Sequence, residues 1–88
     1  MVDPYAELLH RITMDSNVLG GKPIIRGTRV SVQNVLDHLA EEMNFDVMFE
    51  IFPHITMQDV RACIKYGAEV VTEAHEERLR QLATASAR

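Results

Sequence analysis

Several features that would narrow the function are scarce in this 88-residue chain, and each absence excludes a class of protein. The single cysteine, Cys63, cannot form an internal disulfide, which is typical of proteins in a reducing cytoplasm. Apolar runs extend over only a few residues, whereas a membrane-spanning helix needs about 20. The N-terminus also lacks the basic flank and apolar segment of a secretory signal peptide. We therefore expect a cytoplasmic protein that does not associate with a membrane.

Basic residues are missing from the middle of the chain. Residues 31–60 hold six carboxylates and no lysine or arginine, while the whole chain has a net charge of −4. A dedicated nucleic-acid binder normally presents a basic face. This chain offers only local basic patches, so extensive contact with DNA phosphates is disfavoured.

The spacings that support metal binding, phosphate binding or catalysis are absent as well. The four histidines are scattered along the chain: His10, His38, His54 and His75. They form no His-x-x-x-His pair, and Cys63 has no Cys-x-x-Cys partner. Gly21 and Gly27 have the wrong separation for a Walker A loop, and no lysine follows Gly27. We therefore predict no enzyme activity, no catalytic residues, no metal and no cofactor.

The length and the 47% hydrophobic content indicate one small globular domain over residues 1–88. We expect residues 1–31 to form an N-terminal arm with short strands and residues 32–70 to form a three-helix unit. Residues 71–88 are expected to be a C-terminal helix extension with a frayed tail. Because so small a domain buries a limited share of its surface, we also expect a homodimer.

The arm holds the highest density of glycine and proline in the chain. Residues 20–29 read Gly-Gly-Lys-Pro-Ile-Ile-Arg-Gly-Thr-Arg, with three glycines, one proline and three cations. This pattern predicts a hairpin with a tight turn at Arg26, Gly27 and Thr28. The cations Lys22, Arg26 and Arg29 are candidates for contacting a partner's carboxylates or a DNA backbone. The alternative is a structural hairpin whose arginines are merely solvated.

Two short elements are expected before this hairpin, a helix over about 4–9 and a strand over 11–14. Three helices are expected after it. The first two cover 32–43 and 45–52, as shown by apolar residues at helical spacing. An acidic capping box at 56–59 opens the third helix, which continues towards residue 83. Its apolar stripe consists of Val60, Ile64, Ala68, Val71, His75, Leu79 and Leu82.

The second and third helices, joined by the four-residue turn 53–56, have the spacing of a helix-turn-helix. We therefore predict a mainly α fold, a three-helix homeodomain-like bundle with an N-terminal β-hairpin arm. In such a bundle, exposed residues early in the third helix contact base edges, and here these are Gln58, Arg61 and Lys65. The alternative is a three-helix core with solvated polar faces.

Three motifs taken together resemble a known family. They are residues 11–15, residues 20–30, and Phe52-Pro53-His54-Ile55-Thr56 followed by Asp59, Val60 and Ala62. This combination resembles the bacterial and archaeal domain of unknown function 433 over about residues 11–70. The resemblance implies a homeodomain-like fold similar to VapB-type antitoxins, which are often encoded beside a PIN-like ribonuclease toxin.

The resemblance implies that the chain is the antitoxin of a type II toxin–antitoxin pair. It would neutralise a PIN-like toxin by direct binding and could bind its own operator DNA. PIN-type nucleases concentrate carboxylates to hold metal, and Arg26, Arg29, Arg78 and Arg80 are candidates to pair with these carboxylates. Two alternatives stay open. One is a solitary helix-turn-helix transcriptional regulator, and the other is a structural homodimer that does not bind DNA.

Overall fold

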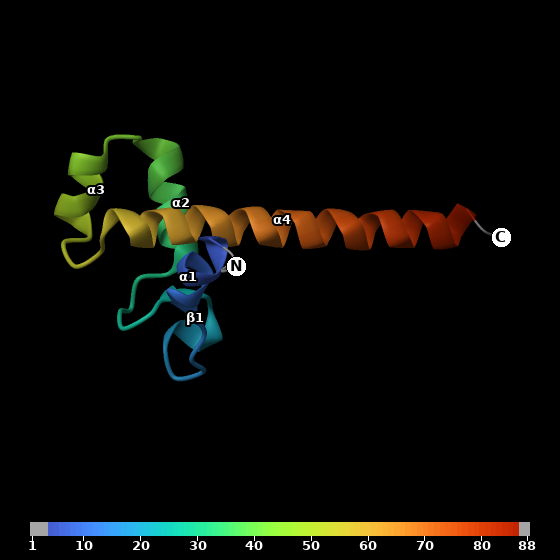
Figure 1. Cartoon of the computed structure of the whole chain (residues 1–88), viewed down its shortest axis with the longest axis horizontal. Coiled ribbons are helices and arrows are strands. Elements are labelled where there is room, and N and C mark those ends of the chain that lie inside the picture. Colours follow the sequence, from blue (N-terminus) through green and yellow to red (C-terminus); the bar gives the residue numbers. More distant parts are fainter. Residues whose placement is uncertain (1–3, 87–88) are drawn as a thin grey trace.

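The structure is a computed structural model that describes the backbone of residues 4–86. The chain is mainly helical, with a two-stranded antiparallel sheet and a short 3-10 turn at Leu19–Gly21. The helices are α1 (Pro4–His10), α2 (Val32–Glu41), α3 (Phe45–Ile51) and α4 (Met57–Ser86), and the strands are β1 (Ile12–Thr13) and β2 (Ile24–Ile25). In Figure 1, α2 and α3 lie on one side of the first part of α4, and α1 and the arm lie on the other.

The arm contains the predicted hairpin in a reduced form. β1 pairs antiparallel with β2, in the register Ile12 with Ile25. The chain then turns at 26–29 and returns, so that Ser31 forms a single isolated bridge with Ile24. The return leg does not extend into a strand because Ser31 is already the N-cap of α2.

Side-chain caps explain where the helices begin. Ser31 Oγ accepts a hydrogen bond of 3.0 Å from the backbone N–H of Asn34 at the start of α2. At the start of α4, Thr56 and Asp59 exchange reciprocal bonds. The Thr56 N–H donates to Asp59 Oδ2 at 2.9 Å, and the Asp59 N–H donates to Thr56 Oγ1 at 3.2 Å. This confirms the predicted capping box, which satisfies two N–H groups that a helix N-terminus otherwise leaves unpaired.

One hydrophobic core lies where α1, the arm, α2, α3 and the first turns of α4 meet. Its buried members are Leu8, Ile12, Ile25, Val32, Val35, Leu39, Met48, Ile55, Val60, Ala62 and Cys63. Gly67 lies where α4 passes α2, and a Cβ at this position would be 3.0 Å from Leu36 Cδ1. Glycine therefore allows the two helices to approach closely, which is the tertiary reason for a poor helix former inside α4.

Two of the predicted helices end more than one residue from the expected position. α2 ends at Glu41 rather than at residue 43, and Met43 is 68% exposed. α4 continues to Ser86, so the residues expected to fray from 83 onward are helical up to this point, while 87 and 88 lie outside the described residues. Ala83 and Ala85 of this last segment have high helix propensity, which favours continuation of the helix.

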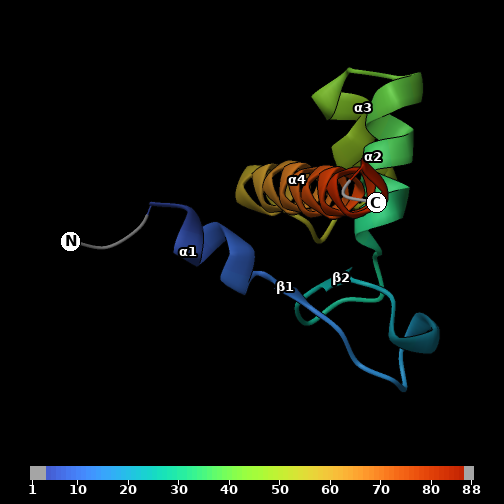
Figure 2. The ribbon, with the colours of Figure 1, turned by 90° about the vertical axis from the view of Figure 1, so that its right-hand side faces the viewer.

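α4 continues well beyond the core. We call residues 71–86 the α4 extension and residues 4–70 the body. Side chains from Val71 to Ala83 are all exposed, and Figure 1 shows the extension projecting without a neighbour. With 30 residues, α4 is about 45 Å long. In Figure 2, a view along α4, α1 lies on one side of the helix, and α2 and α3 lie on another. No helix in residues 4–86 has both the length and the apolar character to cross a membrane.

Candidate partner-binding surfaces

The turn of the arm is held rigidly by one threonine. The Thr28 N–H and its Oγ1 both donate to the carbonyl oxygen of Ile25, at 3.0 and 2.8 Å. The same Oγ1 accepts a bond of 3.0 Å from the N–H of Val30. Gly27 adopts a φ of 80°, which residues with a Cβ adopt only at a cost. The backbone on both sides of Arg29 is therefore fixed.

The two arginines of this turn have different surroundings. Arg26 Nε donates to the carbonyl oxygen of His10 at 2.9 Å, and the Arg26 N–H donates to the carbonyl oxygen of Arg11 at 2.7 Å. Arg26 thus ties the arm to the end of α1. Arg29 is exposed, and no acceptor for its guanidinium is found within the described part of the chain. Of the two, Arg29 is the one available to a partner.

A groove of about 270 Å³ separates the arm from the connection between α3 and α4. We call it the turn groove; residues 27–30 and 51–55 line it. The turn groove therefore lies between two of the three motifs that resemble the known family, residues 20–30 and the motif that begins at Phe52. These two motifs lie far apart in the chain. The ionisable side chains of its lining are Arg29 and His54. Sequence reasoning did not connect these residues, because only the packing of two turns brings them to one groove.

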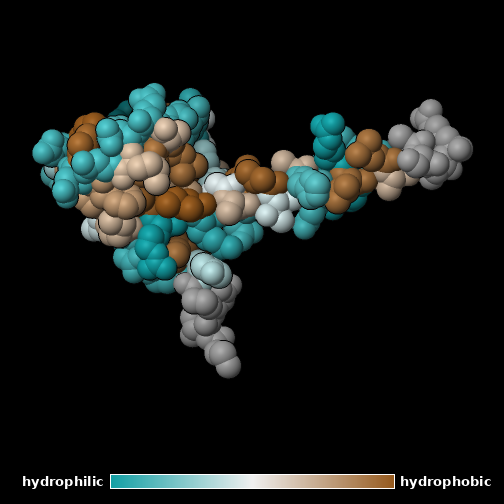
Figure 3. Space-filling model, turned by 90° about the horizontal axis from the view of Figure 1, so that it is seen from above, coloured by the Kyte–Doolittle hydropathy of each residue, from teal (hydrophilic) through white to brown (hydrophobic). Residues whose placement is uncertain are grey.

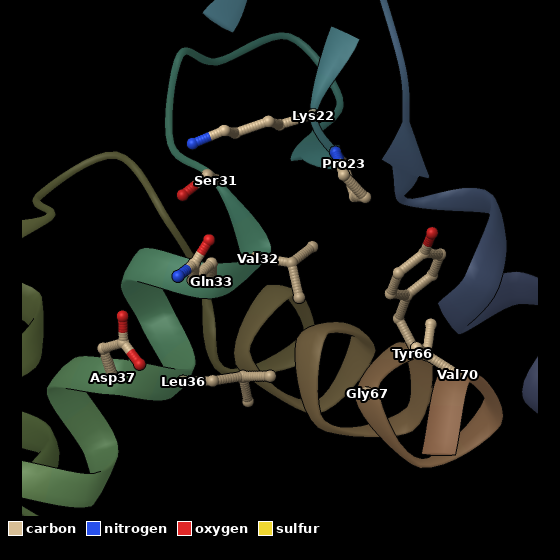
Figure 4. Close-up of a pocket in the computed structure, with 10 residues that line it drawn as sticks. All are labelled: Lys22, Pro23, Ser31, Val32, Gln33, Leu36, Asp37, Tyr66, Gly67 and Val70. Atoms are coloured by element: carbon tan, nitrogen blue, oxygen red, sulfur yellow. The ribbon is translucent and has the colours of Figure 1, made fainter. Parts of the chain in front are cut away.

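A second and larger groove, of about 410 Å³, lies between the arm, α2 and α4. Its apolar side chains are Pro23, Val32, Leu36, Tyr66 and Val70. Figure 4 shows the polar residues Lys22, Ser31, Gln33 and Asp37 along one side, and the apolar residues gathered towards α4 on the other. Because Lys22 and Asp37 have opposite charges, this groove shows no preference for an anion or a cation.

The candidate DNA-reading residues share one face of α4, but all three already have partners. Arg61 Nη1 donates to Gln58 Oε1 at 2.9 Å. Lys65 Nζ lies 2.9 Å from Glu69 Oε1 and 4.2 Å from the centroid of the Tyr5 ring, which belongs to α1. These contacts compete with base or phosphate contacts, because a partner must first break them. The position of α1 beside this face was not predictable from helix spacing.

A buried carboxylate joins the beginning of the chain to the start of α4. Arg11 Nη1 contacts Asp59 Oδ1 at 3.2 Å, and Arg11 Nε contacts Glu7 Oε1 at 3.1 Å. The hydrogen bonds that Arg11 donates to Glu7 and then to Asp59 raise the pKa of Arg11 above its ordinary value. Asp59 is also a member of the capping box, so one side chain both caps α4 and fixes α1 against it. Arg11 is therefore structural, a role that the sequence did not indicate.

Cys63 lies in the core and is closed to chemistry at neutral pH. Burial, and then the charge of Asp59, raise the pKa of the Cys63 thiol to about 12. A thiol with such a pKa is protonated in the neutral range and is a poor nucleophile and metal ligand. Within the described residues, no group of three or more His, Cys, Asp or Glu side chains is placed to hold a metal ion.

The α4 extension carries several exposed apolar side chains. Along α4, the predicted stripe is buried at Val60, whereas Val71 is 68%, Leu79 51% and Leu82 54% exposed. The stripe therefore leaves the core after its first member, and α4 uses a different face, with Ala62 and Cys63, to contact the body. In Figure 3 apolar and polar side chains share the surface of the extension.

The two arginines of the extension lie on different faces of the helix. Arg80 pairs with Glu77 through an Nη2–Oε2 distance of 2.7 Å. Arg78 is exposed and has no ion-pair partner among the residues that the structure describes. At 100° per residue, Arg78 lies at the edge of the stripe, next to Val71 and Leu82, whereas Arg80 faces the opposite side.

Comparisons with known proteins place the body in a family. The family described as "Protein of unknown function (DUF433)" matches residues 12–67, which end just before the α4 extension. The "Uncharacterized protein y4eO" of Sinorhizobium fredii (strain NBRC 101917 / NGR234) is 30% identical over 66 residues. This region is 75% of the present chain but only 30% of y4eO, so the chain spans less than a third of that relative. No solved structure matches. The match over most of the body, turn groove included, shows that this chain belongs to the DUF433 family.

Proposed function

We propose that this protein is the antitoxin of a type II toxin–antitoxin pair and that it binds a PIN-like ribonuclease toxin through the α4 extension. The observation that carries the proposal is the exposed apolar stripe on a helix that projects from the body. A free helix of this length is marginal in water, because most helical stability comes from packing of the apolar face. The stripe therefore favours a partner that covers it.

The dimensions of the extension favour a partner with a groove. Its 16 residues form a rod about 24 Å long and about 10 Å wide. Two such rods in contact along one stripe bury less than the ~1,200 Å² of a stable interface. A groove that encloses the helix on three sides buries more, as in other helix-in-groove complexes. Pairing of two α4 extensions is thus a weaker explanation for the stripe, and the homodimer stays a prediction.

Arg78 is the cation best placed for occlusion of the toxin. It lies at the edge of the stripe, so a partner bound there would also meet its guanidinium. Arginine pairs bidentately with carboxylates, and a metal site of the PIN type is rich in them. Arg80 is engaged by Glu77, and Arg26 is engaged by His10. Lys22 and Arg29 lie on the body, and we assign them no primary role in occlusion.

The matched test uses two neighbouring positions of the extension. Leu82→Asp puts a charge on the stripe, whereas Gln81→Asp puts the same charge outside it. Each variant is co-expressed with a PIN-like ribonuclease, and growth and co-purification are measured. We expect Leu82→Asp to lose neutralisation and Gln81→Asp to retain it, with equal helicity by circular dichroism. Full neutralisation by a Leu79→Asp, Leu82→Asp double variant would overturn the proposal.

Operator binding is the second candidate function, either beside toxin binding or as that of a solitary regulator. The observation in its favour is that Gln58 and Arg61 are exposed on the first two turns of α4. DNA binding of this kind is salt-dependent, and substitution of Gln58, Arg61 or Lys65 should weaken it. A gel-shift assay with the upstream DNA at low salt tests it, and the absence of a shifted band would leave the antitoxin without operator binding. A structural homodimer remains if both assays are negative.

A further inference from the structure

We infer that the turn groove is a second binding site, which takes a peptide segment that carries a carboxylate beside a bulky apolar side chain. The inference is independent of the proposed toxin binding. The groove lies where the chain enters α4, whereas the extension lies at the other end of the same helix. Figure 1 shows the α3–α4 connection and the free end of α4 on opposite sides of the molecule.

Both walls of the groove are held in place by the protein itself. Thr28 closes one wall through its bonds to Ile25. The other wall is closed by a bond of 3.2 Å from the Ile55 N–H to the carbonyl oxygen of Phe52. The Phe52 ring packs edge-on against His38, with centroids 6.0 Å apart and planes at 86°. A ligand therefore orders little of the protein when it binds, which lowers the entropic cost of binding.

The interior of the groove suits one apolar side chain. Val30 and Phe52 are half-buried and Ile55 is buried, while Ile51 is 52% exposed at the edge. Contact with these residues removes apolar surface from water on both partners, which favours binding.

The charges around the groove select the second feature of the ligand. No carboxylate occurs among the lining residues 27–30 and 51–55, although residues 31–60 carry six. Arg29 has no acceptor within the described chain, so its fork of N–H groups can donate two parallel hydrogen bonds to a carboxylate. His54 is a second polar group on the same groove.

A single carboxylate fits this site better than a nucleic acid does. Asp46 and Glu50 are exposed on α3, whose last residue lines the groove. A DNA backbone would bring many phosphates towards these carboxylates, whereas a peptide brings one charge to Arg29. The apolar interior would also stay empty beside a phosphate backbone.

The probe for this site is N-acetyl-leucinate, with N-acetyl-leucinamide as its uncharged counterpart. Each is titrated into the full ¹⁵N-labelled chain, and amide shifts are followed by NMR. We expect shifts confined to residues 27–30 and 51–55, and binding about tenfold weaker for the amide, as for loss of one charge-assisted bond. Equal binding of the two probes would overturn the carboxylate preference, and absence of shifts at these residues would overturn the site.

Two exposed substitutions separate the charge from the apolar interior without touching the core. Arg29→Gln should weaken the leucinate and leave the leucinamide unchanged, whereas Ile51→Ser should weaken both. Glu73→Gln on the extension is the control and should change neither. Shifts of the same amides by a short DNA duplex, stronger than those by leucinate, would overturn the peptide in favour of nucleic acid. If inorganic phosphate caused shifts equal to those caused by leucinate, the groove would bind anions in general, and the proposed peptide site would be wrong.

Discussion

The first turns of α4 and the α4 extension belong to one continuous helix but are stabilised in different ways. In the body, Val60, Ala62 and Cys63 belong to one buried core with residues of α1, α2 and α3, and a capping box satisfies the start of the helix. In the extension, Leu79 and Leu82 have the same helical spacing and no contact with the body. Helical periodicity thus predicts a helix, but it does not tell whether the apolar face is covered within the same chain.

The two regions should differ most in how much a single substitution changes the free energy of unfolding. Met48→Ala empties a fully buried position and should lower the free energy of unfolding by about 2–5 kcal/mol. Leu82→Ala removes an exposed side chain and should change it by less than about 0.5 kcal/mol. Urea unfolding at several protein concentrations measures both. A large, concentration-dependent cost for Leu82→Ala would mean that two extensions pack together in solution.

The second comparison concerns the two arginines of the extension. Arg78→Glu should weaken binding of a PIN-like toxin by about 2 kcal/mol, or roughly 30-fold, because it brings a negative charge to a carboxylate-rich site. Arg80→Glu should have a much smaller effect, since Arg80 is paired with Glu77 away from the stripe. Calorimetry with a catalytically inactive toxin provides the measurement. Equal losses for the two variants would show that the total charge of the extension matters rather than its face.

The third prediction uses the burial of Cys63 to test whether the core of the body excludes water. The pKa of this thiol is about 12 in the folded chain and about 8.5 in an unfolded one. Above about pH 8.5 the unfolded state loses a proton that the folded state keeps, so stability falls with rising pH. The slope is at most about 1.4 kcal/mol per pH unit. Cys63→Ala should remove this part of the slope in unfolding experiments between pH 8 and 10; an unchanged slope would indicate an open core.

Among the substitutions in the body, the smallest effect is expected at the N-cap of α4. Thr56→Ala removes the hydroxyl that accepts from the Asp59 N–H and should cost about 1 kcal/mol. The loss should appear in the unfolding of the body and leave the helicity of the extension unchanged, because the extension lies many turns away. Circular dichroism combined with hydrogen exchange separates the two regions. Faster exchange along the extension would show that the cap stabilises α4 as one unit.

The parts of the fold that depend on local chemistry could be predicted from the sequence. The side chains of Ser31 and Thr56 mark the starts of α2 and α4, because each pairs with backbone groups only three residues away. The face of α4 that contacts the body could not be chosen in this way. Both Val60 with Leu82 and Ala62 with Cys63 lie on apolar faces, and the choice depends on where α1 and α2 pack.

The candidate sites were predictable to a similar degree. The exposed cations of the arm and of α4 could be named from the sequence, but their partners could not. Arg26 and Arg29 are separated by two residues, yet one bonds to His10 and the other lines a groove with His54. Such differences arise from contacts between distant segments, which residue spacing does not encode.

The continuity of α4 has a mechanical consequence. The helix runs from Met57 to Ser86 without a break, even through Gly67. α4 therefore keeps its two ends about 45 Å apart. The turn groove lies at one end, and the apolar stripe reaches the other. Two partners held at these ends could not touch each other unless one of them is large. Any influence of one on the other would have to pass through the rod itself, as a change in its tilt against the body.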